Sequence, residues 1–145
     1  MRVPEPIAPF HHRLTAQTRF NDFDMFGHLN NGAYLQLLDL GKVKYFEAVN
    51  GKPVDWRKVT VVVVNINCSF YSPAYFDEPL EVLTACVKIS EHSFVLEQRV
   101  VNPESGDTKC VGQTVMAGFD PATATGAPIP KDWADSLKDF ENWEE

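Results

Sequence analysis

Apolar residues recur at helical spacing over one long stretch of the chain, residues 31–49. Positions i, i+3, i+4, i+7 and i+11 share one face of a helix, and here they hold Tyr34, Leu37, Leu38, Gly41 and Tyr45. The opposite, solvent side is expected to carry the charged residues of the stretch, Asp39, Lys42, Lys44 and Glu47. The pattern predicts one long amphipathic helix early in the chain.

Both ends of this predicted helix carry the usual signals. Asn30 or Asn31 can cap the start, because an Asn side-chain oxygen accepts a hydrogen bond from an unpaired backbone N–H there. Asn50 followed by Gly51 is typical of a helix end. Gly41 lies in the middle, where glycine costs about 1 kcal/mol against alanine, and this indicates close contact with a neighbouring backbone.

The rest of the chain has the pattern of β-strands. Alternating apolar and polar residues predict a weak strand at residues 13–20 and a longer one at residues 59–71. The longer strand opens with the run TVVVV, which is too apolar for an exposed strand. Further strands are expected at residues 80–89, 94–101 and 110–119, and the short turns between them predict an antiparallel meander.

One apolar-faced helix followed by at least four antiparallel strands predicts an α+β fold in which helix and sheet share one core. The 145 residues fit a single domain. Its core is expected over about residues 13–120, after an N-terminal arm at residues 1–12. Residues 121–145 are expected to form a linker and a short acidic helix.

Composition and charge narrow the expected partners. A net charge of -7 gives no general attraction to nucleic acid or anionic lipid, because both are polyanionic. No run approaches the roughly 18 apolar residues that span a bilayer, and the N-terminal segment lacks the apolar stretch of a secretory signal. Cys68, Cys86 and Cys110 show no C-x-x-C spacing and indicate reduced thiols. We therefore expect a cytoplasmic protein that binds neither nucleic acid nor membrane.

The segment before the predicted helix holds the densest group of candidate catalytic side chains. Asp22, Asp24 and His28 precede Asn30 and Asn31 at the helix entrance. A helix N-terminus offers unpaired N–H donors and a partial positive charge, which suit a developing oxyanion. A carboxylate beside such donors can activate a water molecule or attack a carbonyl itself.

Other interpretations of this segment stay open on spacing alone. Gly27 removes side-chain bulk where a backbone approaches a substrate, but Asp, Gly, His and Asn are also ordinary loop and cap residues. Side chains two apart in an extended segment point the same way, so spacing does not choose between Asp22 and Asp24. His28 has no second His at i+4, and we expect no metal and no cofactor.

The string FNDFDMFGHLNNGAYLQLLDLGKVKYF, residues 20–46, resembles the signature of the 4-hydroxybenzoyl-CoA thioesterase branch of the hot-dog superfamily. That signature has a strand, D-x-D, a Gly, a short turn, an Asn and a Tyr-Leu near the start of the central helix. The stretch INCSFYSPAYFDEPLEV, residues 66–82, is similar to the family's next strand, Pro-containing loop and Asp-bearing turn. The resemblance covers roughly residues 15–119. It implies a hot-dog fold, a curved antiparallel sheet wrapped around one long central helix.

The resemblance also implies an activity, hydrolysis of an acyl-CoA to free acid and CoA. It makes Asp24 the catalytic carboxylate, as general base or nucleophile, and Asp22 structural. The backbone N–H near Asn31 would polarise the thioester carbonyl. The implied oxyanion and substrate-binding residues are Gly27, Asn30, Asn31 and Tyr34.

The segment His-Leu-Asn-Asn, residues 28–31, is similar to a segment of plant acyl-carrier-protein thioesterases, in which the motif D-x-N-x-H supplies three polar groups. Asp24 and His28 fit that pattern, but Phe26 stands in the place of the Asn. The resemblance therefore implies His28 as a helper of Asp24, and a capping role stays open beside it. An alternative function is a non-catalytic module that binds an acyl thioester of CoA or of an acyl-carrier protein.

The family's assembly is implied in the same way, as a homodimer or homotetramer with the sites at the interface between edge-paired sheets. Independently, an exposed edge such as the strand at residues 59–71 needs pairing or cover, which a two-fold contact provides. Candidates for contact with the CoA phosphates are Lys88, Arg99 and Lys109.

Overall fold

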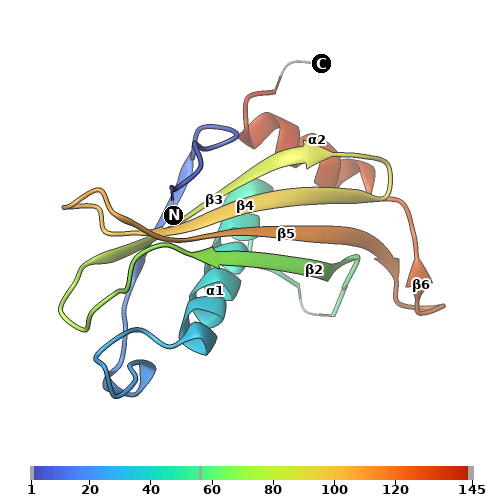
Figure 1. Ribbon diagram of the computed structural model, residues 1–145. Coiled ribbons are helices and arrows are strands. Elements are labelled where there is room, and N and C mark those ends of the chain that lie inside the picture. The colour runs from blue at the N-terminus through green and yellow to red at the C-terminus, as the bar shows by residue number, and fades with distance from the viewer. Residues whose placement is uncertain (1, 56, 144–145) are drawn as a thin grey trace.

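The computed structural model describes residues 2–55 and 57–143. An antiparallel sheet has the strand order β1-β3-β4-β5-β2, with β6 paired to β5, and helix α1 lies along one face of the curved sheet (Figure 1). The strands are β1 (His12–Ala16), β2 (Val61–Phe70), β3 (Leu80–Ile89), β4 (Ser93–Val101), β5 (Thr108–Asp120) and β6 (Thr125–Gly126). The helices are α1 (Asn31–Asn50), α2 (Lys131–Phe140) and the short 3-10 helix η1 (Phe20–Asp22). This arrangement confirms the expected α+β hot-dog fold.

The predicted meander is confirmed, because β3 pairs with β4 and β4 pairs with β5, both antiparallel. β1 pairs with β3 at one edge of the sheet, and β2 pairs with β5 at the other. Within the single chain, the TVVVV run lies partly uncovered: β2 is an edge strand, and Val64 leaves 58% of its surface exposed. The bulge between Val63 and Asn65 turns part of the run out of the core.

Helix α1 ends as predicted but begins differently. Gly51 follows its last turn with φ of 69°, in the left-handed region that glycine adopts without strain, and its N–H donates to the carbonyl of Glu47. Asn30 is the N-cap residue by position, yet its side chain makes no capping hydrogen bond. The predicted capping by Asn30 or Asn31 was therefore wrong, and among the described residues no side chain closes the first turn of α1.

Gly41 allows α1 to approach the sheet closely. A Cβ added at this residue would lie 2.6 Å from Val82 Cγ1 and 3.1 Å from the Gln98 amide nitrogen. The predicted close contact is present, but it is made by side chains of β3 and β4 and not by a neighbouring backbone. Gln98 also donates to the carbonyl of Leu38 at 2.9 Å, which fixes the helix over this part of the sheet.

One charged residue of α1 was assigned to the wrong side. Lys42 was expected in solvent, but only 4% of its surface is exposed, and its ammonium donates to Thr114 Oγ1 on β5 at 3.3 Å. Lys42 lies four residues after Leu38 and four before Phe46, which are both buried, so it belongs to the buried stripe of α1. Its long side chain passes through this stripe to reach β5.

Both terminal segments are fastened to the domain. Glu97 and Arg99 lie on the sheet face opposite α1, since Gln98 between them faces the helix. Arg99 donates to the carbonyl of Pro4 at 2.7 Å, and Glu97 accepts from the N–H of Ile7 at 3.2 Å. The N-terminal arm thus runs along this outer face before β1.

At the C-terminal end, α2 covers the C-terminal half of α1. The hydroxyl of Tyr45 donates to the buried carboxylate of Glu141, and the N–H of Cys86, freed at a bulge in β3, donates to the same oxygen at 3.1 Å. Burial, followed by the bond to Glu141, raises the pKa of Tyr45. Among the described residues no helix combines the length and apolar character needed to cross a membrane.

Candidate active site

The segment between η1 and α1 forms a tight loop with Asp24 on one arm and His28 on the other. Phe23 and Leu29 pair as an antiparallel bridge, and the N–H of Asp24 donates to the carbonyl of His28 at 2.9 Å. The N–H of Leu29 donates to the carbonyl of Ala74 at 2.8 Å, which ties the loop to residues 71–79. The loop is thus closed on itself and fastened from one side.

The Asp24 carboxylate is oriented by the backbone of its own loop. One oxygen, Oδ1, accepts from the N–H of Phe26 at 2.9 Å and from the N–H of His28 at 3.1 Å. The second oxygen has no protein partner among the described residues, and the residue is exposed. Gly27 has φ of 77°, a conformation that favours glycine, and this turn brings the N–H of His28 back toward the carboxylate.

The start of α1 follows directly. Asn30 donates its N–H to the carbonyl of Asp22 at 2.8 Å, and Asn31 is the first helical residue and is exposed. The first N–H groups of a helix have no intrahelical partner. Since no described side chain caps them, they remain available as donors beside the Asp24 loop.

The side chain of His28 does not contact Asp24 by any hydrogen bond among the described residues; its backbone N–H does. Its ring packs edge-on against Tyr75 with centroids 5.2 Å apart, and more loosely against Phe26 at 6.3 Å. The structure therefore joins His28 to Asp24 through the backbone, while the imidazole lies between two exposed aromatic rings.

Asp22 lies two residues before Asp24, and its carboxylate has different hydrogen-bond partners. Its carboxylate accepts from the N–H of Arg19 at 2.8 Å and from the guanidinium of Arg19 at 3.1 Å. These two bonds, the backbone one first, hold the pKa of Asp22 below its ordinary value. The geometry is that of a carboxylate that closes the η1 turn.

Tyr34 lies beneath the site, in the core. It is buried together with Leu29 and Ala74, and its ring centroid lies 5.1 Å from that of Phe70 at the end of β2. Burial raises the pKa of Tyr34. The residue thus connects the first turn of α1 to the last residue of β2.

The loop at residues 71–79 is anchored by a partly buried ion pair that the sequence did not reveal. Lys109 Nζ lies 2.7 Å from Glu78 Oε1 and donates to the carbonyl of Pro73 at 3.1 Å. The other oxygen of Glu78 accepts from the N–H of Tyr75 at 2.7 Å. This contradicts the assignment of Lys109 to the CoA phosphates. Arg99, holding the N-terminal arm, is equally unavailable, whereas Lys88 is exposed.

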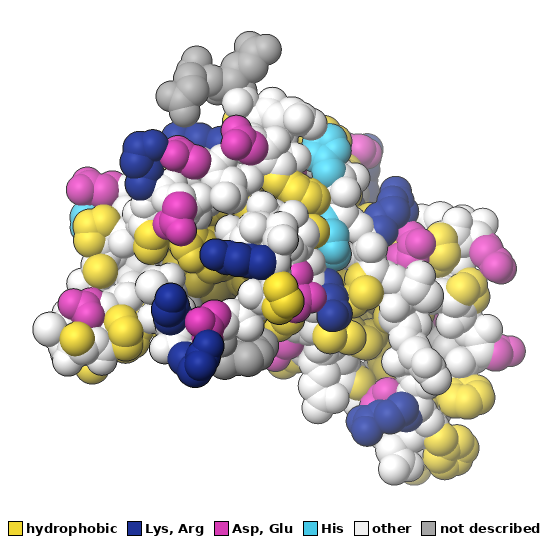
Figure 2. Space-filling model, turned by 180° about the vertical axis from the view of Figure 1, so that it is seen from behind, with side chains coloured by type: hydrophobic (Ala, Val, Ile, Leu, Met, Phe, Trp, Pro, Cys, Tyr) yellow, Lys and Arg dark blue, Asp and Glu magenta, His cyan; other side chains and the backbone are white. Residues whose placement is uncertain are grey.

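Large apolar side chains surround the Asp24 loop on its outer side. Met25 exposes 90% of its surface, and Phe20, Phe26 and Phe76 are also mostly exposed. Figure 2 shows hydrophobic side chains on the lobe at the lower right, where the loop before α1 lies when Figure 1 is turned round. Such a group of exposed aromatic residues is typical of an interaction surface.

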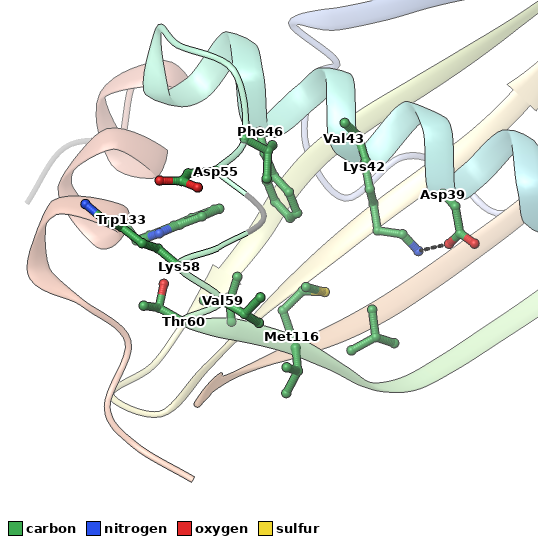
Figure 3. Close-up of a pocket in the computed structure, with 14 residues that line it drawn as sticks. Asp39, Lys42, Val43, Phe46, Asp55, Lys58, Val59, Thr60, Met116 and Trp133 are labelled. Carbon is green, nitrogen blue, oxygen red and sulfur yellow. Dashed lines mark ion pairs between the residues drawn. The ribbon is translucent and has the colours of Figure 1, made fainter. Parts of the chain in front are cut away.

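Two hollows lie toward the other end of α1. One has a cavity volume of about 260 Å³, is mostly apolar and lies between α1, β2 and α2 (Figure 3). An adjoining, more polar hollow of about 370 Å³ is lined in part by Lys52 and Lys58. Neither hollow includes Asp24 of the same chain, so loop and cavity are separate features of the monomer.

The comparisons with known proteins agree with this geometry. A model of the family described as the thioesterase-like superfamily matches residues 18–137. The comparison with curated proteins gave no match.

Among solved structures, the chain is similar to a thioesterase from Thermus thermophilus complexed with coenzyme A and Zn. The TM-score is 0.82 at 23% identity, over 94% of this chain and 98% of that chain. A predicted thioesterase from Bacillus stearothermophilus has a TM-score of 0.80 at 19% identity, over 92% and 97% of the two chains. A 1,4-dihydroxy-2-naphthoyl-CoA thioesterase from Synechocystis has a TM-score of 0.76 at 18% identity, over 88% and 95%. At these identities the likenesses show the fold.

Proposed function

This chain belongs to the thioesterase-like superfamily and is a thioester hydrolase. We propose that it cleaves an acyl-CoA into the free acid and coenzyme A, with Asp24 as its catalytic carboxylate. The observation that carries the proposal is the geometry of Asp24. One of its oxygens is fixed by two backbone N–H groups, and the other is open next to the uncapped start of α1.

Thioester hydrolysis needs a nucleophile on one side of the carbonyl and donors for the oxyanion on the other. The open oxygen of Asp24 supplies the first, either by taking a proton from an attacking water or by attacking the carbonyl carbon itself. The first N–H groups of α1, at Asn31 and Gly32, supply the second. If Asp24 acts as base, the tetrahedral intermediate collapses with cleavage of the carbon–sulfur bond, and the CoA sulfur takes up the proton that Asp24 accepted from water. If Asp24 attacks the carbonyl, the same bond breaks and the CoA thiolate leaves an anhydride on Asp24. Water then hydrolyses this anhydride to the free acid and the Asp24 carboxylate, and its second proton goes to the thiolate.

In this mechanism His28 positions Asp24, because its backbone N–H donates to the Asp24 carboxylate and its ring packs against Tyr75. Gly27 permits the turn that makes this possible. Asn30 leads the chain into α1, and Tyr34 supports the site from the core.

Coenzyme A as the carrier is supported by two similar structures. The Thermus thermophilus thioesterase was solved with coenzyme A, and the Synechocystis thioesterase is named for a naphthoyl-CoA. We carry the CoA ester over to this chain as part of the proposal.

A homodimer completes the proposed enzyme. β2 pairs only with β5 among the described strands, and its free edge carries the exposed side chains of Val63, Val64, Ile66 and Phe70. An unpaired apolar edge invites pairing with another strand, and a second copy of β2 offers the same surface in a two-fold arrangement. Two such dimers can form the homotetramer.

The test is release of CoA thiol from a panel of acyl-CoAs, followed with a thiol-reactive dye. The panel should include short-chain, long-chain and aromatic acyl groups, each also offered on an acyl-carrier protein. Hydrolysis of at least one CoA ester is expected. Tight binding of the esters without thiol release would instead identify a binding module.

A further inference from the structure

The cavity beside α1 is built from the second half of the helix and the first half of β2. Its apolar wall includes Val43 and Phe46 of α1, Val61 of β2, Met116 of β5 and Trp133 of α2. Figure 3 shows Phe46 and Trp133 at one end, Met116 at the floor and Lys42 with Asp39 at the other end. The volume of about 260 Å³ is close to the lower end of the roughly 300–1,000 Å³ typical of small-molecule sites.

Lys42 is the one buried charged side chain in the lining of this cavity, among the residues that the structure describes. Its ammonium has two oxygen partners, Thr114 Oγ1 at 3.3 Å and Asp39 Oδ1 at 3.3 Å. Both distances are longer than is usual for a charge-assisted bond. An ammonium has three N–H donors, so at least one is left for a group inside the cavity.

Packing alone gives little reason for a lysine at this position. Burying an ammonium is costly unless its donors are well satisfied, and an apolar side chain of similar length would fill the space between α1 and β5 at no such cost. Asp39 is mostly exposed and weakly held, so it does not replace a buried counter-charge. A ligand oxygen that enters the cavity would satisfy the remaining donor.

The dimer of the proposed function brings this cavity to a catalytic loop. The cavity lies at the start of β2, near Val61, whereas the Asp24 loop lies at its end, where Phe70 packs on Tyr34. When two copies of one strand pair antiparallel about a two-fold axis, the start of each lies beside the end of the other. The cavity of one protomer therefore adjoins the Asp24 loop of its partner.

We infer that this cavity receives the acyl group of the substrate and that Lys42 selects acyl groups carrying an oxygen acceptor, a hydroxyl or a carboxylate, on their apolar part. The inference rests on the proposed function and deepens it by naming the substrate class. An acyl group of this kind fills the apolar wall and gives the Lys42 ammonium its missing partner. An unsubstituted acyl group of the same size leaves that donor unpaired, which costs binding.

The experiment compares matched CoA esters with and without the oxygen. Suitable sets are benzoyl-CoA, 4-hydroxybenzoyl-CoA and 4-carboxybenzoyl-CoA, and octanoyl-CoA with its 8-hydroxy and 8-carboxy forms. The wild-type chain, Lys42→Met and Lys44→Met are assayed for kcat/KM on each ester. Lys44 is an exposed lysine on the same helix, paired with Glu47, and serves as the matched control. The hydroxyl and carboxylate esters show which acceptor is preferred.

In the wild type, at least one oxygen-bearing ester of a set should exceed its plain partner in kcat/KM by about tenfold or more. Lys42→Met should bring that ratio close to one, and Lys44→Met should keep it. A wild-type preference for the plain esters, or a ratio unchanged in folded Lys42→Met, would overturn the inference.

Binding separates this inference from the proposed function. Dissociation constants of the same esters, measured by calorimetry on Asp24→Asn, should show the same preference, and Lys42→Met in that background should remove it. If the wild type hydrolyses none of the esters but binds them with this preference, hydrolysis is wrong and the acyl site stands. If it hydrolyses them all equally well, the acyl site is wrong and hydrolysis stands. Should Lys42→Met fail to fold, Lys42→Leu, which also removes the N–H donors, takes its place.

Discussion

At the residue scale, the carboxylate of Asp24 is held by the N–H groups of Phe26 and His28, so the backbone conformation of the loop decides where its open oxygen points. Gly27 lies between these two donors with φ of 77°. A side chain on a residue with this conformation crowds its own carbonyl, which costs about 1–2 kcal/mol. The orientation of the Asp24 carboxylate therefore depends on the turn at Gly27.

Gly27→Ala should lower the free energy of unfolding by about 1 kcal/mol and also lower kcat, because the loop relaxes away from the conformation that holds Asp24. An added Cβ meets no atom within 4 Å, so strain alone causes the effect. Gly32→Ala is the matched control. It has equally open space in the first turn of α1 and should be neutral or slightly stabilising. Urea unfolding of both variants makes the comparison, and equal stabilities would contradict it.

His28→Ala should lower kcat by roughly tenfold to a hundredfold, below the usual range for an essential general base. The variant keeps the N–H that Asp24 accepts and loses only the ring that packs on Tyr75. The assay is kcat on the best CoA ester. A loss as large as that of an Asp24 variant would give His28 a direct chemical role, and no loss would reduce it to a loop residue.

At the scale of elements, hydrophobic periodicity was sufficient for α1, which buries one stripe at helical spacing, and the short turns between β3, β4 and β5 were sufficient for the meander. Periodicity failed at one residue of the buried stripe of α1. Lys42 is polar by type, yet it points under α1 because Gly41 lets the helix come close to β3 and β4 while β5 stays within reach of a long side chain. Periodicity carries no information on such contacts between distant segments.

The same limit applied to the candidate site. The sequence placed Asp24, His28 and Asn31 in one segment, which local spacing can do. It did not reveal that Glu78 and Lys109 fasten the neighbouring loop, since that pair joins residues brought together only by the fold. Nor did it predict the fastening of the N-terminal arm through Arg99.

Glu78 makes the stability of this loop dependent on pH. Burial acts to raise the pKa of its carboxyl, but hydrogen bonds from Lys109, Asn102 and Tyr75 outweigh it and hold the pKa below the ordinary value of 4.5. A carboxyl whose pKa is lowered by folding stabilises the folded state above its unfolded pKa. It loses that contribution as the pH falls through the folded pKa.

We therefore expect Glu78→Gln to lower the melting temperature at pH 7 and to reduce the difference from wild type as the pH drops below about 4.5. Glu104→Gln, at an exposed position in the turn after β4, should leave the profile unchanged. Thermal unfolding between pH 3 and pH 7 provides the measurement. A Glu78→Gln deficit that stays constant across this range would argue against the ion pair as its source.

At the scale of the whole molecule, the edge of β2 and the aromatic residues around the Asp24 loop are exposed in the single chain. In the proposed dimer, a second copy covers the edge of β2, and the cavity of one copy meets the Asp24 loop of the other. The proposed active site is complete only in the dimer, because the cavity of one protomer does not include its own Asp24.

Val64→Lys should convert the protein to a monomer and lower kcat/KM, because a charged residue on the free edge of β2 opposes strand pairing. Ile7→Lys places the same charge on another exposed apolar residue, on the N-terminal arm, and should keep the oligomer. Light scattering at micromolar concentration measures the oligomeric state of both variants, and the thiol-release assay measures their kcat/KM. A wild-type protein that is monomeric and fully active would contradict the dimer and the shared site.

The central claim is that Asp24 performs the chemistry, and its most direct test is kcat of folded Asp24→Asn beside Asp22→Asn on a CoA ester that the wild type hydrolyses. The Asn variant keeps the size of the side chain and an oxygen for the N–H groups of Phe26 and His28, but it lacks the basic, nucleophilic oxygen. We predict that kcat falls about a hundredfold or more with little change in KM, because the lost interaction belongs to the transition state. Asp22→Asn should act mainly on stability. Near-normal kcat in folded Asp24→Asn would contradict the mechanism.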